Sequence, residues 1–139
     1  MTAPMLPRSG RREFQLPRDD AEALRVGGYY WEAAIVQGVQ WLFVQDFQLP
    51  VGFTAKSVAL AIRIPPGYPT AALDMIYVSP AIYRIDGKVI AALSLATIDG
   101  CAFQQWSRHY TAQNPWIPDV SDIGSHLRAA AEWFLKALT

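Results

Sequence analysis

Several features are scarce in this sequence, and each absence excludes a class of protein. The chain has one cysteine and two histidines among 139 residues. A single cysteine excludes an internal disulfide and a cysteine-based zinc site. No apolar run approaches the ~18 residues that cross a bilayer, and the opening MTAPMLPRSGRR has no apolar stretch after its charges. We therefore expect no membrane span, no secretory signal and a cytoplasmic location.

Neither sign of charge is in excess. Twelve basic side chains are balanced by twelve acidic ones, whereas a protein that binds nucleic acid through its phosphates needs a basic face. The chain is 52% hydrophobic, which is typical of a folded protein with a real core. The length predicts one domain. We assign residues 1–13, which mix Pro, Ser, Gly and Arg, to a flexible tail and residues 14–139 to the domain.

The middle of the chain alternates apolar and polar residues with the period of β-strands. Short links between the alternating stretches favour an antiparallel meander over parallel crossovers. The four expected strands are YYWEAAIV, QWLFVQDF, SVALAIRI and LDMIYVSP, with the PPGYP turn at 65–69 before the last. A turn at Asp86-Gly87 predicts a further small hairpin from residues 82–85 and 89–95, although the alanines in the second piece fit a buried irregular segment equally well.

Helices are predicted at both ends of this meander. Asp19 or Asp20 is expected to cap a short helix that Gly27-Gly28 ends. A longer helix should close the chain, with Asp119, Ser121 or Asp122 as its cap. Its apolar face is expected to contain the following residues: Ile123, Leu127, Ala130, Ala131, Phe134 and Leu138. Together the patterns predict an α+β fold.

The segment from Asp99 to Trp116 concentrates the residues that carry chemistry. It holds Cys101 and His109 and shows no regular period, so we expect an irregular segment of the kind that often bears function. A Cys101–His109 nucleophile pair is one interpretation, and a buried structural thiol is the other. His126, on the flank of the last helix, is expected to be structural. The two histidines do not form a metal-ligand spacing, and no phosphate-binding glycine motif occurs, so no metal or cofactor is predicted.

The order of these features resembles the ubiquitin-conjugating E2 enzymes. PPGYP resembles the turn after their third strand, and Trp116-Ile117-Pro118 resembles the W-x-P that precedes their helix. The pieces DMIYVSP and WSRH (residues 106–109) are similar to the bacterial E2 proteins encoded beside ubiquitin-like, E1-like and JAB-type peptidase genes. This resemblance implies a UBC-like fold: a four-stranded antiparallel meander with an N-terminal and a C-terminal helix.

The resemblance also implies a mechanism. Cys101 would accept a ubiquitin-like protein from an E1-like enzyme as a thioester and pass it to an amine of a target. The HPN tripeptide of eukaryotic E2 enzymes is absent, so His109, and after it Asn114, are the candidate helpers. The residues expected to support the loop are Asp99, Trp106, Ser107, Arg108 and Trp116. Arg108 is expected either to bind a carboxylate such as Asp99 or to be solvated.

The implied partners are the E1-like enzyme, the ubiquitin-like protein and a JAB-type peptidase of the same pathway, without nucleic acid, membrane or cofactor. The carrier mechanism requires Cys101 to be exposed, within reach of His109 and low in pKa. The alternative is a non-catalytic E2-fold module that docks the ubiquitin-like protein or the E1, and a buried, unreactive thiol would favour it. A third interpretation, an apolar-ligand binder, requires a large cavity lined by the strands.

Overall fold

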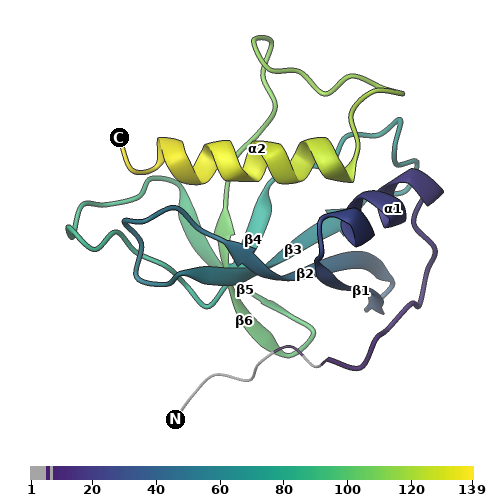
Figure 1. The fold of residues 1–139 in the computed structure, drawn as a ribbon, viewed down its shortest axis with the longest axis horizontal. Helices are drawn as coiled ribbons and strands as arrows, with labels where there is room; N and C mark the ends of the chain where they lie inside the picture. The colour runs from purple at the N-terminus through teal and green to yellow at the C-terminus, as the bar shows by residue number, and fades with distance from the viewer. Residues whose placement is uncertain (1–5, 7) are drawn as a thin grey trace.

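The computed structural model describes residue 6 and residues 8–139, and it combines one sheet with two helices (Figure 1). The elements in chain order are α1 (Arg18–Val26), β1 (Tyr30–Val36), β2 (Val39–Gln48), β3 (Ser57–Ile64), β4 (Ile76–Ser79), β5 (Leu93–Ile98), β6 (Cys101–Trp106) and α2 (Ile123–Lys136). The four predicted strands correspond to β1–β4, and both predicted helices are present. The α+β class is confirmed.

The sheet has six strands rather than the predicted four, in the order β1-β2-β3-β4-β6-β5, and every neighbouring pair is antiparallel. The additional pair is a hairpin joined by Asp99-Gly100, whose φ angles of 57° and 73° suit the tight turns that connect paired strands. The predicted hairpin around Asp86-Gly87 is wrong, because residues 82–92 contain no strand. The Asp-Gly signal occurs twice, and the later copy makes the hairpin.

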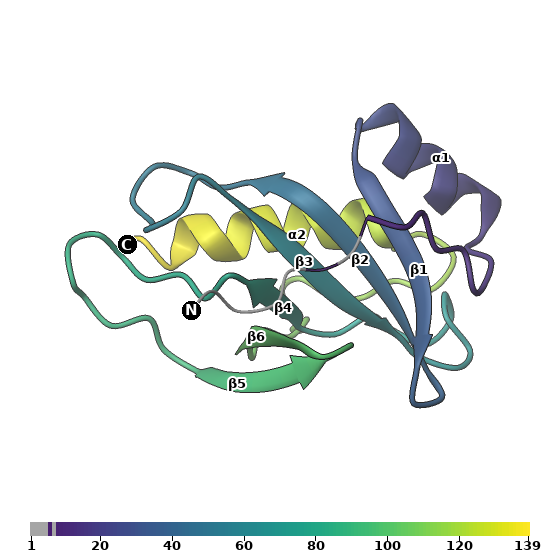
Figure 2. The ribbon, with the colours of Figure 1, turned by 90° about the horizontal axis from the view of Figure 1, so that it is seen from below.

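The two faces of the sheet are covered differently. Alternate residues of the strands pack into a large apolar core beneath α2, which contributes Ile123, Leu127 and Phe134. The opposite face carries a smaller apolar cluster to which α2 contributes nothing. Figure 2 shows the sheet from that opposite side, with α2 behind it.

The smaller face and the free edge of β1 are covered by the N-terminal arm, which we define as residues 8–13. The Glu13 amide donates to the Ala33 carbonyl, and the Ala33 amide donates to the Arg11 carbonyl. The Arg12 guanidinium stacks on Trp31, 3.4 Å from the ring centroid. Of the predicted tail, residues 1–5 and 7 lie outside the described residues.

The predicted N-terminal cap is confirmed for α2 but not for α1. Asp122 accepts a hydrogen bond from the Ser125 amide, and the Ser125 hydroxyl accepts one from the Asp122 amide, so α2 begins with a capping box. Helix α1 begins after Pro17 without a side-chain cap, and the prediction that Asp19 or Asp20 caps it is wrong. Proline at this position already fixes a backbone angle suited to a helix start. The Asp20 carboxylate is therefore available to bind groups outside α1.

Candidate functional site

Cys101 lies at the start of β6, beside the hairpin turn, and only 2% of its surface is exposed to solvent. Burial raises the pKa of its thiol, and Asp99 raises it further, while the Arg11 charge acts in the opposite direction. The expectation of an exposed thiol with a lowered pKa is therefore wrong. The hydrophobic residues that form the cluster around it are Ala34, Trp41, Phe43, Ala61, Ile98 and Phe103.

A buried charge network holds the arm over this cluster. Glu32 is 1% exposed and accepts hydrogen bonds from the Arg11 side chain, the Tyr30 hydroxyl and the Ser9 amide. Burial alone would raise the pKa of Glu32, but these bonds outweigh it and hold that pKa below its usual value. Arg11 also pairs with Asp99 at 2.8 Å. The turn before Cys101 is therefore tied to the arm.

The irregular part of the predicted segment begins only after β6. Ser107 still donates its amide to the Ala92 carbonyl, next to the end of the hairpin. Arg108 donates to the Ala91 carbonyl and lies over the Trp106 ring, 4.9 Å from its centroid. Asp99 pairs with Arg11 instead, so Arg108 ties the ends of the hairpin together rather than binding that carboxylate.

His109 and Asn114 lie in the loop beyond β6, away from the thiol. His109 Nδ1 is 2.8 Å from an Asp74 carboxylate oxygen, and both side chains are more than half exposed. The Asn114 amide donates to Thr111 within a tight turn. At a rise of ~3.3 Å per residue, strand β6 places Cys101 roughly 17 Å from Trp106, and the loop follows that end. The structure does not bring Cys101 and its predicted helpers together.

His126 is the histidine that organises the loop, although the sequence marks it only as structural. It is fully buried, with Nε2 2.9 Å from the Met75 carbonyl and Nδ1 2.7 Å from the Tyr110 hydroxyl. Burial lowers its pKa to about 4, so the ring is neutral at pH 7. A neutral ring donates to the carbonyl and accepts from the hydroxyl. His126 thus links Tyr110, in the loop after β6, to Met75, the residue that precedes β4.

The PPGYP turn is fixed by contacts that no local sequence pattern indicates. The Tyr68 hydroxyl donates to Asp20 at 2.7 Å, and the other Asp20 oxygen accepts the amide of Ile123 at the start of α2. Burial raises the pKa of Asp20 above its usual value. The Trp116 indole donates to the Pro69 carbonyl. One carboxylate and one indole therefore join α1, the turn and α2.

Trp106 and Trp116 anchor the two sides of the loop. Trp106 is fully buried and donates its indole N–H to Gln104, while its ring meets that of Phe134 at 5.0 Å. Trp116 is half-buried and packs against Tyr68 and Tyr110. Both tryptophans pack against the core, as their large rings predict.

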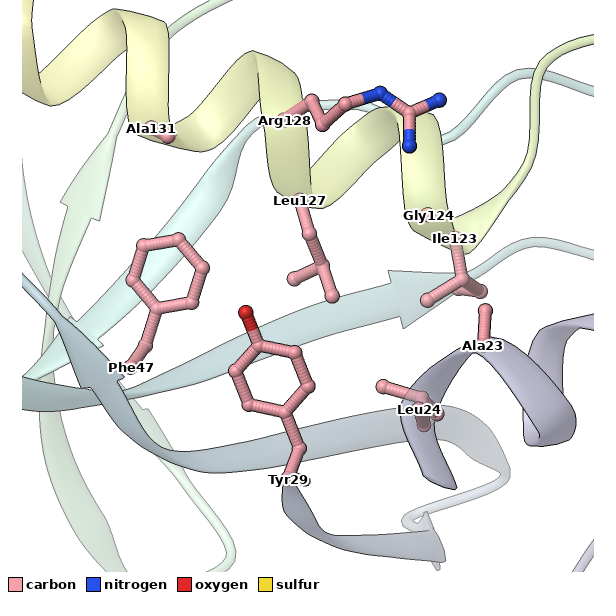
Figure 3. A pocket seen from close by; sticks show the side chains of 9 residues that line it. All are labelled: Ala23, Leu24, Tyr29, Phe47, Ile123, Gly124, Leu127, Arg128 and Ala131. Carbon is pink, nitrogen blue, oxygen red and sulfur yellow. The ribbon is translucent and has the colours of Figure 1, made fainter. Parts of the chain in front are cut away.

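A groove of about 290 Å³ runs between α1 and α2. Figure 3 shows the Tyr29 hydroxyl directed toward Leu127, with Arg128 above it on α2. Phe47 of β2 is the only strand residue in its lining, and none of the predicted site residues belongs to it. This groove therefore does not have the strand-lined shape that an apolar-ligand binder requires.

Among residues 6 and 8–139, no group of three or more His, Cys, Asp or Glu side chains could hold a metal ion. Within the same part of the chain, neither helix is long and apolar enough to cross a membrane.

The chain thus combines an antiparallel sheet, a proline–tyrosine turn and a W-x-P element that precedes the helix covering the sheet. Comparison with protein families matches residues 16–137 to the family described as Prokaryotic E2 family E, and the chain belongs to that family. No curated protein and no solved structure matches the chain. Membership links the protein in general terms to a ubiquitin-like protein and an E1-like enzyme.

Proposed function

We propose that this protein acts in the conjugation of a ubiquitin-like protein as an E2-fold docking subunit. It would hold the ubiquitin-like protein or its E1-like enzyme without forming a thioester of its own. One observation carries the proposal: the only cysteine is 2% exposed and its thiol has a raised pKa. The proposed setting is the cytoplasm, and a JAB-type peptidase of the same pathway is a proposed third partner.

The chemistry of thioester transfer explains why this burial matters. The nucleophile is the thiolate, and its sulfur must reach the carbonyl carbon of the thioester on the E1. Cys101 meets neither requirement, because apolar side chains surround it and burial favours the protonated thiol. The amine-transfer step also needs polar groups beside the sulfur. His109 and Asn114 lie beyond the other end of β6.

The second candidate is the carrier itself, with the thioester on Cys101. This candidate is favoured because the segment that covers Cys101 is the N-terminal arm, which is held by backbone hydrogen bonds and ion pairs, and not a helix packed on the main core. Displacing residues 8–13 would uncover the hairpin turn and the thiol beside it. His109 and Asn114 could then help only after the loop moved as well, so this candidate requires two rearrangements.

A charging assay separates the two candidates. The protein is mixed with the E1-like enzyme, the ubiquitin-like protein and ATP, and adducts are resolved on gels with and without reductant. The variants are Cys101→Ala and Cys101→Ser, and a charged E1 in the same reaction is the control. A docking subunit shows no thiol-sensitive adduct, and Cys101→Ala still binds the E1 or the ubiquitin-like protein. A reducible adduct lost in Cys101→Ala and reductant-stable in Cys101→Ser would establish the carrier.

A further inference from the structure

Three segments that are distant in the sequence meet at one end of the molecule, which we call the loop end. They are residues 49–56 between β2 and β3, residues 82–90 between β4 and β5, and residues 136–139 at the end of α2 and beyond it. The Ile85 amide donates to the Gly52 carbonyl, and the Arg84 guanidinium donates to the Ala137 carbonyl. Figure 1 shows both loops on the side of the molecule where the chain ends. The three segments therefore form one surface.

The charged side chains of the loop end are mostly basic. Its three segments contain four basic side chains and one acidic one, which together give a formal side-chain charge of +3. The acidic residue, Asp86, pairs with Arg84. The other basic residues are all the lysines of the chain: Lys56, Lys88 and Lys136. Each lysine is exposed, and none forms an ion pair with another residue in the described part of the chain.

Large apolar side chains project from the same loops. Val51 is 96% exposed and Val89 is 90% exposed, so each touches almost nothing else in the protein. Ile85, on the same loop as Val89, is also exposed. The loops are already anchored without these residues, because Phe53 and Ile90 are buried in the main core. The projecting side chains are therefore left for contact with another body.

We propose that the loop end binds the surface of an anionic lipid bilayer, with Val51 and Val89 inserted at headgroup level and the lysines around them. Apolar side chains combined with lysines are the pattern by which proteins lie in the interface of a membrane. A lysine side chain is long enough to follow an apolar surface while its ammonium group stays in water. Anionic lipids attract each lysine that lies near the surface.

The shape and the type of charge favour a lipid surface over a protein partner. A protein would have to offer a separate hollow for each projecting side chain, whereas a fluid headgroup layer adapts to both. Arginine is the residue whose planar fork matches protein carboxylates, and the one arginine of the loop end is bound to Asp86. Lysine is a compact point charge that suits phosphate groups.

This surface is independent of the proposed docking role. It also departs from the expectation, drawn from the family resemblance, that no membrane takes part.

Co-sedimentation of the full chain with vesicles tests the proposal. The protein should pellet with vesicles of phosphatidylcholine mixed with phosphatidylglycerol and stay in the supernatant with vesicles of phosphatidylcholine alone. High salt should release it, because salt screens exposed charges. A sample without vesicles controls for aggregation. Equal binding to both kinds of vesicle, or no binding to the anionic ones at low salt, would overturn the proposal.

Two double variants locate the binding surface. Lys56→Gln with Lys88→Gln should lower the partition coefficient about 25-fold, at ~5-fold or ~1 kcal/mol for each lysine. Arg18→Gln with Arg63→Gln is the matched control and should bind as the wild type does. Both arginines are exposed, lie outside the loop end and form no ion pair with another described residue. Equal losses in the two double variants would contradict a site at the loop end.

A third double variant tests insertion. Val51→Ser with Val89→Ser should lower the partition coefficient at least about 10-fold, the low end for burying one valine, with an unchanged circular dichroism spectrum. An unchanged partition coefficient would show adhesion by charge alone and would refute the inserted geometry. If the lysine variant instead lost the ubiquitin-like protein or the E1-like enzyme, while the wild type bound no vesicles, the loop end would be a protein interface and the proposal would be wrong.

Discussion

The two faces of the sheet are closed by covers of different kinds. Helix α2 is held by a continuous apolar core in which Phe134 contacts Phe47, Phe53 and Trp106. The arm is held mainly by charges and backbone bonds around Glu32. Apolar burial tolerates changes of pH and salt, whereas a buried ion network depends on every partner. The face that contains the only thiol therefore has the cover that a single polar substitution can loosen.

Removing the centre of the helix-covered face should have the largest effect. Phe134→Ala empties a fully buried site among three aromatic rings and should reduce the free energy of unfolding by about 3–5 kcal/mol. Urea denaturation measures the change. Leu135→Ala, one position along and 49% exposed, is the control and should cost far less. Equal losses of unfolding free energy in the two variants would show that Phe134 does not anchor α2 to the core.

The N-terminal arm over Cys101 should be loosened by a substitution in the charge network around Glu32. Glu32→Gln keeps the shape of the side chain but leaves the Arg11 guanidinium without its buried partner. Breaking such a pair costs about 3 kcal/mol at the lower end of known cases, and Arg11 retains Asp99. The urea midpoint reports this loss. Asp46→Asn, which breaks an exposed pair with Arg8, should cost less than about 1 kcal/mol. A wild-type midpoint for Glu32→Gln would contradict the assignment.

The loop on the α2 side should respond to acid through His126. Its pKa in the folded protein is about 4, below the ~6.5 of an unfolded histidine. Because the unfolded chain binds the proton more tightly, the stabilisation is complete above pH 6.5 and is lost as pH falls toward 4.

Between pH 7 and pH 4.5 this histidine should account for a loss of about 2.5 kcal/mol, at ~1.4 kcal/mol per pKa unit. Urea unfolding at both pH values measures it. His126→Gln is the control, since it does not titrate, and the difference between the two proteins isolates the contribution of the ring. Parallel pH profiles for the wild type and His126→Gln would show that the histidine is not held neutral.

The smallest effect is expected at the exposed pair of the same loop. Asp74→Asn removes the partner of His109, but both side chains are more than half exposed. Such pairs contribute about 0–1 kcal/mol, so thermal unfolding should barely change, in contrast to His126→Gln. A loss as large as that of His126→Gln would mean that His109, rather than His126, fastens the loop.

The sequence predicted the parts of the fold that depend on local pattern. Alternation located β1–β4, and the apolar spacing of Ile123, Leu127 and Phe134 located α2. Of the three predicted caps of this helix, Asp122 is the one that the structure shows. The β5–β6 hairpin was missed because two Asp-Gly pairs compete. The alanine-rich stretch before Leu93 gives no alternation to choose between them. The sequence specifies the register of an edge strand only weakly, because such a strand pairs with a single neighbour.

The candidate site was less predictable because its contacts join distant positions. Cys101 and His109 are near in sequence, but a strand forms between them and directs the chain away. Asp20 bonds to Tyr68 and Ile123, and Glu32 bonds to Arg11, across separations that no spacing rule covers. Burial of a lone polar side chain leaves no periodic trace in the sequence. The family motifs identified the fold, but they did not place the thiol.

The most direct test of this account is the rate at which Cys101 reacts with a thiol reagent such as DTNB. We predict that the native wild type reacts at least about 100-fold more slowly than the urea-unfolded chain, because a buried thiol must wait for an opening. Glu32→Gln should react faster than the wild type, since it loosens the arm. A native rate within a few-fold of the unfolded rate would contradict the buried thiol and, with it, the docking role.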